Sequence, residues 1–152
     1  MKILDFVRPD LVVADVQGRD KNAVIDELAG HLAAHVPGLD HEALRKVLLE
    51  RERLASTAIG DGIAIPHGKM SIGRLVGCVG RSRQGTDFDS MDGRPTHIFF
   101  VLVAPENSTG IHLKALARIS RLCKDSGVRD RIMRASDADE MFRIIADEDG
   151  KY

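Results

Sequence analysis

The stretch that decides the fold is Thr96-His97-Ile98-Phe99-Phe100-Val101-Leu102-Val103-Ala104. Its apolar residues follow one another without alternation, which is typical of a strand buried on both faces. We therefore expect this stretch to be the central strand of a sheet. Because predicted helices and strands alternate along the rest of the chain, the expected class is α/β: a single domain with a mixed β-sheet flanked by helices on both faces.

Two helices are predicted upstream of this strand. Asp20 can cap a first helix, whose apolar residues follow helical spacing until Pro37-Gly38 ends it, and Asp40 can cap a second. The second helix extends into the charged run Glu50 to Arg53, where Arg51 lies at the edge of the buried face. Further strands are expected at residues 62–65 and 75–81. The polar stretch 84–95 is predicted to be a turn-rich connection, with room for a short edge strand.

Three helices are predicted downstream. The first begins at Thr109 and ends near Lys124, where Ser126-Gly127 stops it. A short helix follows at residues 128–134, and a capping box at Ser136 to Asp139 predicts a terminal helix. The apolar stripe of the first of these helices is expected to contain Leu113, Leu116, Ile119, Leu122 and Cys123.

The composition argues against several classes of function. The 152 residues fit one domain spanning residues 1–152, and 22 Lys+Arg against 23 Asp+Glu give a net charge of -1, so we expect no nucleic-acid partner. Aromatic residues, at 4%, are too few for base-stacking platforms. No apolar run approaches the roughly 20 residues of a membrane span, so no membrane insertion is expected. Cys78 and Cys123 each lie among apolar residues, which indicates buried, reduced thiols in a cytoplasmic protein.

The clearest candidate for chemistry is the histidine of Pro66-His67-Gly68. Proline fixes the backbone on one side of it and glycine leaves open space on the other, so a bulky partner could reach the ring. Taken locally, the same three residues are more typical of a turn that follows a strand than of a functional site. The other histidines give no metal pattern, because the spacing of His31 and His35 lacks accompanying carboxylates. We expect no metal and no cofactor.

The segment from Glu50 to Lys69 resembles the active-site segment of EIIA proteins of the bacterial phosphoenolpyruvate-dependent phosphotransferase system, in the fructose/mannitol-type family. A second match is Thr109-Gly110-Ile111-His112-Leu113, at the start of a helix. Within the family the chain most resembles the nitrogen-regulatory EIIA. The resemblance implies that His67 accepts a phosphoryl group, with His112 and Arg51 beside it. It also implies a phosphate environment formed by Gly68, Lys69, Ser56 and Thr57.

These residue types suit phosphoryl relay. Imidazole is a nucleophile that is neutral at cytoplasmic pH and also a good leaving group. Arg51 can stabilise the equatorial oxygens with a permanently charged fork of donors, and His112 in the first turn of a helix adds a donor near the positive end of the dipole. Without the resemblance, the favoured interpretation of His112 is a helix-face histidine with no role. Lys69 either steers the donor or only solvates the turn.

The absence of a Gly-x-x-x-x-Gly-Lys-[Ser/Thr] loop argues against a nucleotide-dependent kinase, so the donor should be a phosphoprotein. The resemblance implies that this donor is an HPr-like phosphocarrier protein. The favoured function is a phosphotransferase component of the nitrogen-regulatory type, whose phosphorylation state controls binding to regulatory target proteins. One alternative is a sugar-specific EIIA that passes the group to an EIIB for fructose or mannitol uptake. Another is a binding module that has lost phosphorylation; a hydrolase or metalloenzyme is a distant fourth.

Overall fold

The computed structural model describes residues 1–151, so Tyr152 of the predicted domain lies outside it. The predicted central strand is confirmed: β6 pairs antiparallel with β5 on one side and parallel with β3 and β4 on the other. In spatial order the six-stranded sheet contains β1 (Val12–Val13), β5 (Val76–Thr86), β6 (Thr96–Pro105), β3 (Ile63–Ala64) and β2 (Ala58–Gly60), and β4 (His67–Met70) pairs with β6 off this path.

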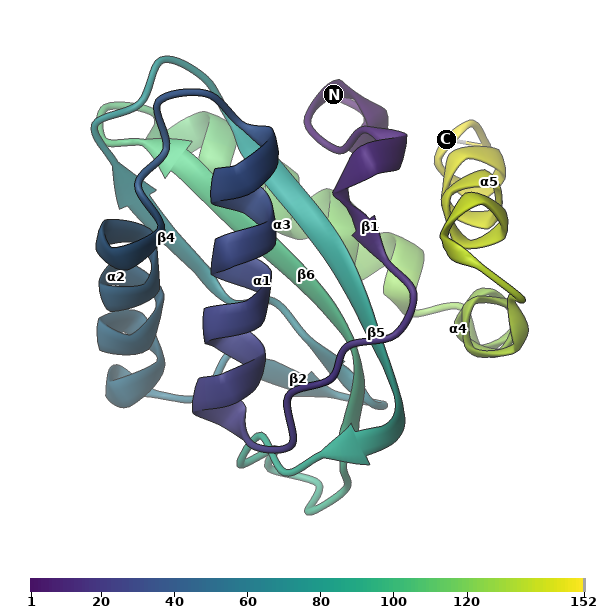
Figure 1. The fold of residues 1–152 in the computed structure, drawn as a ribbon. Coiled ribbons are helices and arrows are strands. Elements are labelled where there is room, and N and C mark those ends of the chain that lie inside the picture. Colours follow the sequence, from purple (N-terminus) through teal and green to yellow (C-terminus); the bar gives the residue numbers. More distant parts are fainter. Residues whose placement is uncertain (152) are drawn as a thin grey trace.

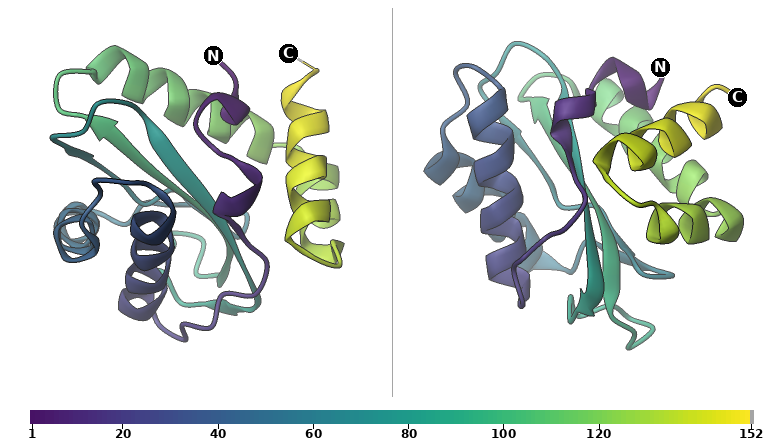
Figure 2. Two further views of the ribbon diagram at one scale, coloured as in Figure 1. Left: turned by 45° about the horizontal axis from the view of Figure 1, so that its top comes forward. Right: turned by 45° about the vertical axis from the view of Figure 1, so that its right-hand side comes forward.

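Helices cover both faces of this mixed sheet, as predicted (Figure 1). Two lie on one face and three on the other, with the last of the three beside β1 (Figure 2). The first pair is α1 (Lys21–His35) and α2 (His41–Leu54); the others are α3 (Thr109–Cys123), α4 (Ser126–Arg134) and α5 (Ala138–Asp149). Short 3-10 turns η1 (Ile3–Asp5) and η2 (Pro9–Leu11) precede β1.

Aspartate side chains set the starts of four of these helices. Asp20 and Asp40 accept from the third amide of α1 and α2, as expected. Asp125 caps α4, so Ser126-Gly127 begins that helix, and the prediction that this pair ends the preceding one was wrong. Asp137 caps α5, one residue later than the predicted capping box, and the carboxylate of Glu140 bonds back to Ser136. In each case a carboxylate satisfies amides that have no partner within the helix.

The three predicted strands are all present, and two of them differ from the prediction in length. β5 extends past residue 81 through a bulge to Thr86, which pairs with Thr96, so the polar connection shortens to residues 87–95 and contains no separate edge strand. The strand expected at 62–65 is reduced to two residues, because Pro66 has no N–H to donate to a ladder. β1, β2 and β4 were not predicted.

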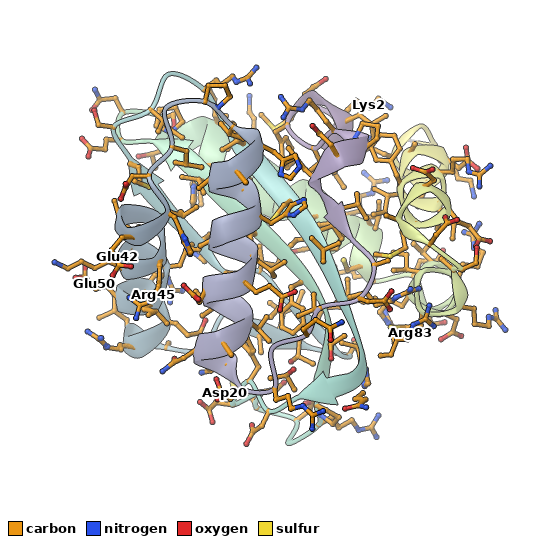
Figure 3. All side chains as sticks on the ribbon, in the orientation of Figure 1. Lys2, Asp20, Glu42, Arg45, Glu50 and Arg83 are labelled. Atoms are coloured by element: carbon orange, nitrogen blue, oxygen red, sulfur yellow. The ribbon has the colours of Figure 1, made fainter. Side chains whose placement is uncertain are left out.

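The core is mainly aliphatic, with Phe6, Phe88, Phe99 and Phe100 also buried in it, and lies between the sheet and its two helical layers. β6 is buried along Ile98 to Ala104, and charged side chains such as Glu42, Arg45 and Glu50 point outward from α2 (Figure 3). Cys78 and Cys123 are free and buried, and burial raises the pKa of the Cys123 thiol to about 12. Within residues 1–151, no helix combines the length and apolar character that crossing a bilayer requires.

Candidate functional site

A cleft of about 660 Å³ lies between α2, β4 and the first turns of α3. It brings together five of the seven residues that the sequence singled out, from three elements far apart in the chain: Arg51, His67, Gly68, Lys69 and His112. The other lining residues are Val47, Glu50, Leu54, Thr109, Leu113 and Leu116. The histidines therefore share one concave site, although 45 positions separate them in the sequence.

His67 is the first residue of β4, where its backbone lies opposite Leu102 of β6. The interpretation of Pro66-His67-Gly68 as a turn was wrong, because the Pro66 carbonyl accepts from Leu102 N at 2.9 Å and continues the parallel ladder. The ring is half-buried, and Nδ1 lies 2.7 Å from the carbonyl oxygen of Ile65. Since a carbonyl only accepts, the proton is on Nδ1 and the lone pair of the neutral ring is on Nε2.

The environment of His67 favours that neutral ring. Burial lowers the pKa of His67; the hydrogen bond to Ile65 opposes this, the charge of Arg51 adds to it, and the charge of Glu52 again opposes it. The net direction is downward from the ordinary value of 6.5. Nε2 is therefore available as a nucleophile at neutral pH without a separate base.

His112, in the first turn of α3, lies against His67 with ring centroids 5.2 Å apart and planes at 59°. It is only 6% exposed, and its Nδ1 is buried with no hydrogen-bond partner among residues 1–151. Burial lowers the pKa of His112 to about 4, with smaller contributions from His67 and Lys69. A proton on Nδ1 would have no acceptor, and the low pKa favours the neutral ring, so the single ring proton is on Nε2.

Two cations and a helix end complete the polar part of the cleft. Arg51 donates from Nη1 to the carbonyl of Ala55 at 2.8 Å, at the C-terminal end of α2. Lys69 Nζ donates to Thr109 Oγ1 at 3.0 Å. The hydroxyl of Ser108, the N-cap of α3, donates to the Pro105 carbonyl, which leaves the first amides of α3 without a side-chain cap. Helix N-termini of this kind bind anions.

Gly68 has a packing role that was not predicted. A Cβ on this residue would overlap Cγ1 of Val47 on α2. Glycine therefore permits the close approach of α2 to β4, and this approach brings the arginine of α2 near the histidine of β4.

Ser56 and Thr57 lie outside the lining of the cleft. The Ser56 hydroxyl donates to the Phe88 carbonyl at 2.6 Å, and Thr57, 5% exposed, donates its hydroxyl to Glu52 at 2.5 Å. Both side chains are thus engaged in holding the segment after α2. Glu52, although it belongs to the charged run Glu50 to Arg53, is buried at 6% exposure.

Sequence reasoning also missed an apolar rim around the histidines, formed by Val47, Leu54, Leu113 and Leu116. Leu54 is 83% exposed and Leu113 60%, so the placement of Leu113 in the core stripe was wrong. His112 takes the buried position in that first turn. Exposed leucines beside a polar site indicate a surface that binds a protein.

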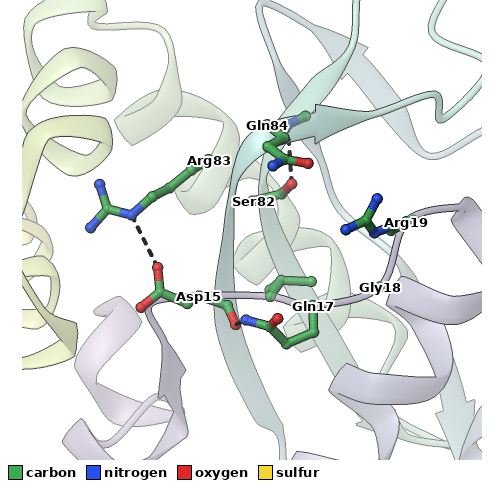
Figure 4. Close-up of a pocket in the computed structure, with 9 residues that line it drawn as sticks. Asp15, Gln17, Gly18, Arg19, Ser82, Arg83 and Gln84 are labelled. Carbon is green, nitrogen blue, oxygen red and sulfur yellow. Dashed lines mark hydrogen bonds and ion pairs between the residues drawn. The ribbon is translucent and has the colours of Figure 1, made fainter.

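A second hollow, of about 420 Å³, lies near the opposite end of β6, between the 15–19 loop and Ser82 to Gly85 of β5 (Figure 4). Arg83 pairs there with Asp15 at 3.0 Å, and Gly85 N donates to the Ser82 hydroxyl. Its lining contains no histidine, cysteine or lysine. The candidate nucleophile His67 and the cations Arg51 and Lys69 all line the cleft between α2, β4 and α3.

Comparison with known proteins gives a consistent assignment. The family model described as "Phosphoenolpyruvate-dependent sugar phosphotransferase system, EIIA 2" matches residues 5–148. A nitrogen regulatory protein of Bradyrhizobium diazoefficiens is 39% identical over 147 residues, which cover 96% of this chain and 95% of that protein. A fructose-specific EIIABC component of Bacillus subtilis is 35% identical over 98% of this chain, but over only 24% of its own length.

The fold agrees with this assignment. The crystal structure of the nitrogen regulatory protein IIA-Ntr from Neisseria meningitidis superposes with a TM-score of 0.88 at 31% identity, covering 94% of this chain and 98% of that one. The mannitol IIA of Escherichia coli, at 18% identity, shares the fold with a TM-score of 0.76.

Proposed function

The chain belongs to the EIIA type 2 family of the phosphoenolpyruvate-dependent phosphotransferase system, and from this premise we propose that it is a phosphocarrier that accepts a phosphoryl group on Nε2 of His67. The observation that carries the proposal is the hydrogen bond from Nδ1 to the Ile65 carbonyl, which leaves Nε2 with its lone pair in a cleft beside Arg51 and His112. The donor is a phosphohistidine protein of the HPr-like class.

The transfer step is an in-line displacement at phosphorus. The Nε2 lone pair forms a bond to phosphorus while the P–N bond of the donor breaks, and its electron pair stays on the donor nitrogen. The Nδ1 proton stays on His67 throughout and is donated to the Ile65 carbonyl. The phosphorylated ring is then an imidazolium, whose later departure as neutral imidazole makes onward transfer easy.

Three groups stabilise the charge on the equatorial oxygens during this step. Arg51 supplies a guanidinium that stays protonated, and His112 supplies an Nε2–H from a neutral ring. The uncapped amides at the start of α3 add donors at the positive end of a 15-residue helix. Lys69, bonded to Thr109, contributes positive charge at the rim.

The apolar rim supports a protein, not a metabolite, as the phosphoryl donor. Leu54 and Leu113 project from α2 and α3 on either side of the cleft, and a partner that covers them would also exclude water from the reaction. We propose that the same surface serves regulatory targets, with phosphorylation changing its charge. The nitrogen-regulatory role is favoured by the names and full-length coverage of the relatives, such as that of Bradyrhizobium diazoefficiens.

The test is incubation with phosphoenolpyruvate, enzyme I and an HPr-like carrier, followed by intact-mass measurement under alkaline conditions that preserve phosphohistidine. We expect one added phosphoryl group, lost in His67→Ala and retained in the control His41→Ala, whose ring lies on the exposed surface. No added phosphate, or phosphate retained in His67→Ala, would refute the assignment.

A sugar-specific role is the second candidate, favoured by the 35% identity to the fructose-specific component of Bacillus subtilis. The two are separated by chasing the phosphorylated protein with a fructose or mannitol EIIB. Rapid loss of the label to EIIB would favour the sugar role. Retention of the label, with phosphorylation-dependent capture of a regulatory protein, would favour the nitrogen-regulatory one.

A further inference from the structure

Glu52 is a buried carboxylate next to the cleft for which the transfer step above has no use. It follows Arg51 on α2 but does not line the cleft, and its two oxygens accept hydrogen bonds from the segment after the helix and from α1. Both oxygens accept from Thr57 N at 3.1 Å, and Oε1 also accepts from the Thr57 hydroxyl. Lys21 Nζ, from α1, donates to Oε2 at 3.0 Å.

The turn that Glu52 closes leads to Arg51. The 52–57 turn consists of the last three residues of α2 and the first three residues after it. The contacts of Glu52 with Thr57 join its two ends, and Ala55 lies between them. The Ala55 carbonyl accepts from Arg51 Nη1 at 2.8 Å. Because the direction of that carbonyl depends on the loop, the position of the guanidinium depends on Glu52.

The same turn leads to His67 by a second path. The Thr57 carbonyl accepts from Ile65 N at 3.0 Å, and the Ile65 carbonyl accepts from His67 Nδ1 at 2.7 Å. Thr57 therefore donates its backbone N–H to Glu52 and accepts, with its carbonyl, from Ile65, the residue that orients His67. Hydrogen bonds of this segment therefore connect Glu52, through Thr57, with the positions of both Arg51 and His67.

We propose that Glu52 is a positioning residue for phosphoryl transfer, which fixes the guanidinium of Arg51 and the ring of His67 relative to one another through the 52–57 turn. This inference rests on the proposed function of His67. Lys21 is part of the device, because it supplies the only positive side chain paired with this buried carboxylate in residues 1–151. Although burial acts to lower it, hydrogen bonds to Asp89 and Glu52 raise the pKa of Lys21, so the ammonium is charged at neutral pH.

Glu52→Gln tests the proposal, because glutamine keeps the size but removes the charge, and its NH2 group cannot accept from Thr57 or Lys21. We expect phosphoryl acceptance to slow by about 10- to 100-fold, the effect of displacing reacting groups by about 1 Å. The pKa of His67 should fall, since the charge of Glu52 raises it. In ¹⁵N NMR spectra, His67 should lose its single Nδ1–H tautomer. The tautomer is the discriminating reading: a purely structural role would leave the proton on Nδ1, whereas loss of the Glu52 charge alone lowers the pKa of His67.

Two variants of Thr57 test the same proposal if the Glu52→Gln protein fails to fold. Thr57→Val is isosteric but loses the hydroxyl donor to Glu52, and we expect it to slow transfer by about 3- to 10-fold, the equivalent of one hydrogen bond. Thr57→Ser keeps the donor and should retain the wild-type rate. Asp89→Asn is the control for Lys21, because Asp89 is the exposed partner of the same ammonium and should leave the rate within about twofold.

Folded Glu52→Gln with wild-type rate and an unchanged His67 tautomer would overturn the proposal, as would Thr57→Val and Thr57→Ser behaving alike. A wild-type protein that accepts no phosphoryl group would refute the proposed function instead. In that case the NMR readings still decide whether Glu52 orients His67, so the two failures are distinguishable.

Discussion

Replacing Gly68 with alanine tests the contact that holds α2 against the start of β4. A Cβ on Gly68 would come closer than 3.0 Å to Val47 Cγ1, whereas carbon atoms in ordinary contact are about 3.5–4.0 Å apart, so the two elements must separate by about 1 Å. Val47 cannot rotate away, because a β-branched side chain in a helix has essentially one χ1 rotamer. Overpacking of this kind destabilises by about 1–3 kcal/mol. For a chain of this length Tm should fall by about 2–12 °C.

The same movement should slow the relay. Arg51 is one helical turn from Val47, so the guanidinium would move away from His67, and a displacement of about 1 Å lowers the rate by up to about 100-fold. Thermal unfolding followed by circular dichroism gives the stability, and timed intact-mass measurement gives the rate. The matched control is Val47→Ala combined with Gly68→Ala, in which the overlapping methyl is absent. If Gly68→Ala is equally destabilising in both backgrounds, or leaves Tm unchanged, the packing argument is wrong.

Three further predictions concern stability and docking. His112 should make the fold acid-sensitive. Its pKa is about 4 in the folded state and near 6.5 in the unfolded state, so the unfolded state binds the proton first as the pH falls. The free energy of unfolding should therefore fall as the pH drops from 6.5 towards 4, by about 2–3 kcal/mol at about pH 4.5. Urea unfolding at about pH 6.5 and about pH 4.5 should show a smaller loss of stability in His112→Asn than in the wild type. An equal loss in the two proteins would contradict the role of His112. Leu54→Asp and Leu113→Asp should leave the free energy of unfolding within about 0.5 kcal/mol, because both side chains are exposed, but raise KM for the phosphorylated carrier about tenfold with kcat little changed. An unchanged KM would remove the apolar rim from the docking surface. Arg81→Met should lower the free energy of unfolding, measured in urea, by about 2–4 kcal/mol, because the fully buried guanidinium donates to the carbonyls of Ala14, Ile132 and Ala135. A loss below about 1 kcal/mol would show that water satisfies these carbonyls in place of the guanidinium.

The parts of the fold that sequence predicts well are those with a strong local signal. The apolar run of β6 and the aspartate caps of α1 and α2 were placed correctly because each depends on residues close together in the chain. β1 and β2 have two and three residues and exist only through pairing with β5 and β3. His67 was assigned to a turn for the same reason, since its strand is defined by a partner 35 positions away, Leu102.

The site shows the same division. The resemblance named the two histidines and Arg51, and the fold brings them into one cleft. It also named Ser56 and Thr57, whose side chains instead hold the segment after α2. The run Glu50 to Arg53 has the same sequence pattern whether Glu52 is buried or solvated. Leu113 likewise fits the spacing of a core stripe, although its side chain is exposed. Burial of this kind is decided by α1 and β4, which pack against α2 from elsewhere in the chain.

The most direct test of the central claim is the position of the phosphoryl group on the ring. The protein, labelled with ¹⁵N at histidine, is incubated with phosphoenolpyruvate, enzyme I and an HPr-like carrier, and long-range ¹H–¹⁵N spectra identify the nitrogen bonded to phosphorus. The hydrogen bond from Nδ1 to Ile65 predicts phosphate on Nε2 of His67, with the Nδ1 proton still present. Phosphate on Nδ1 of His67, or on His112, would contradict it.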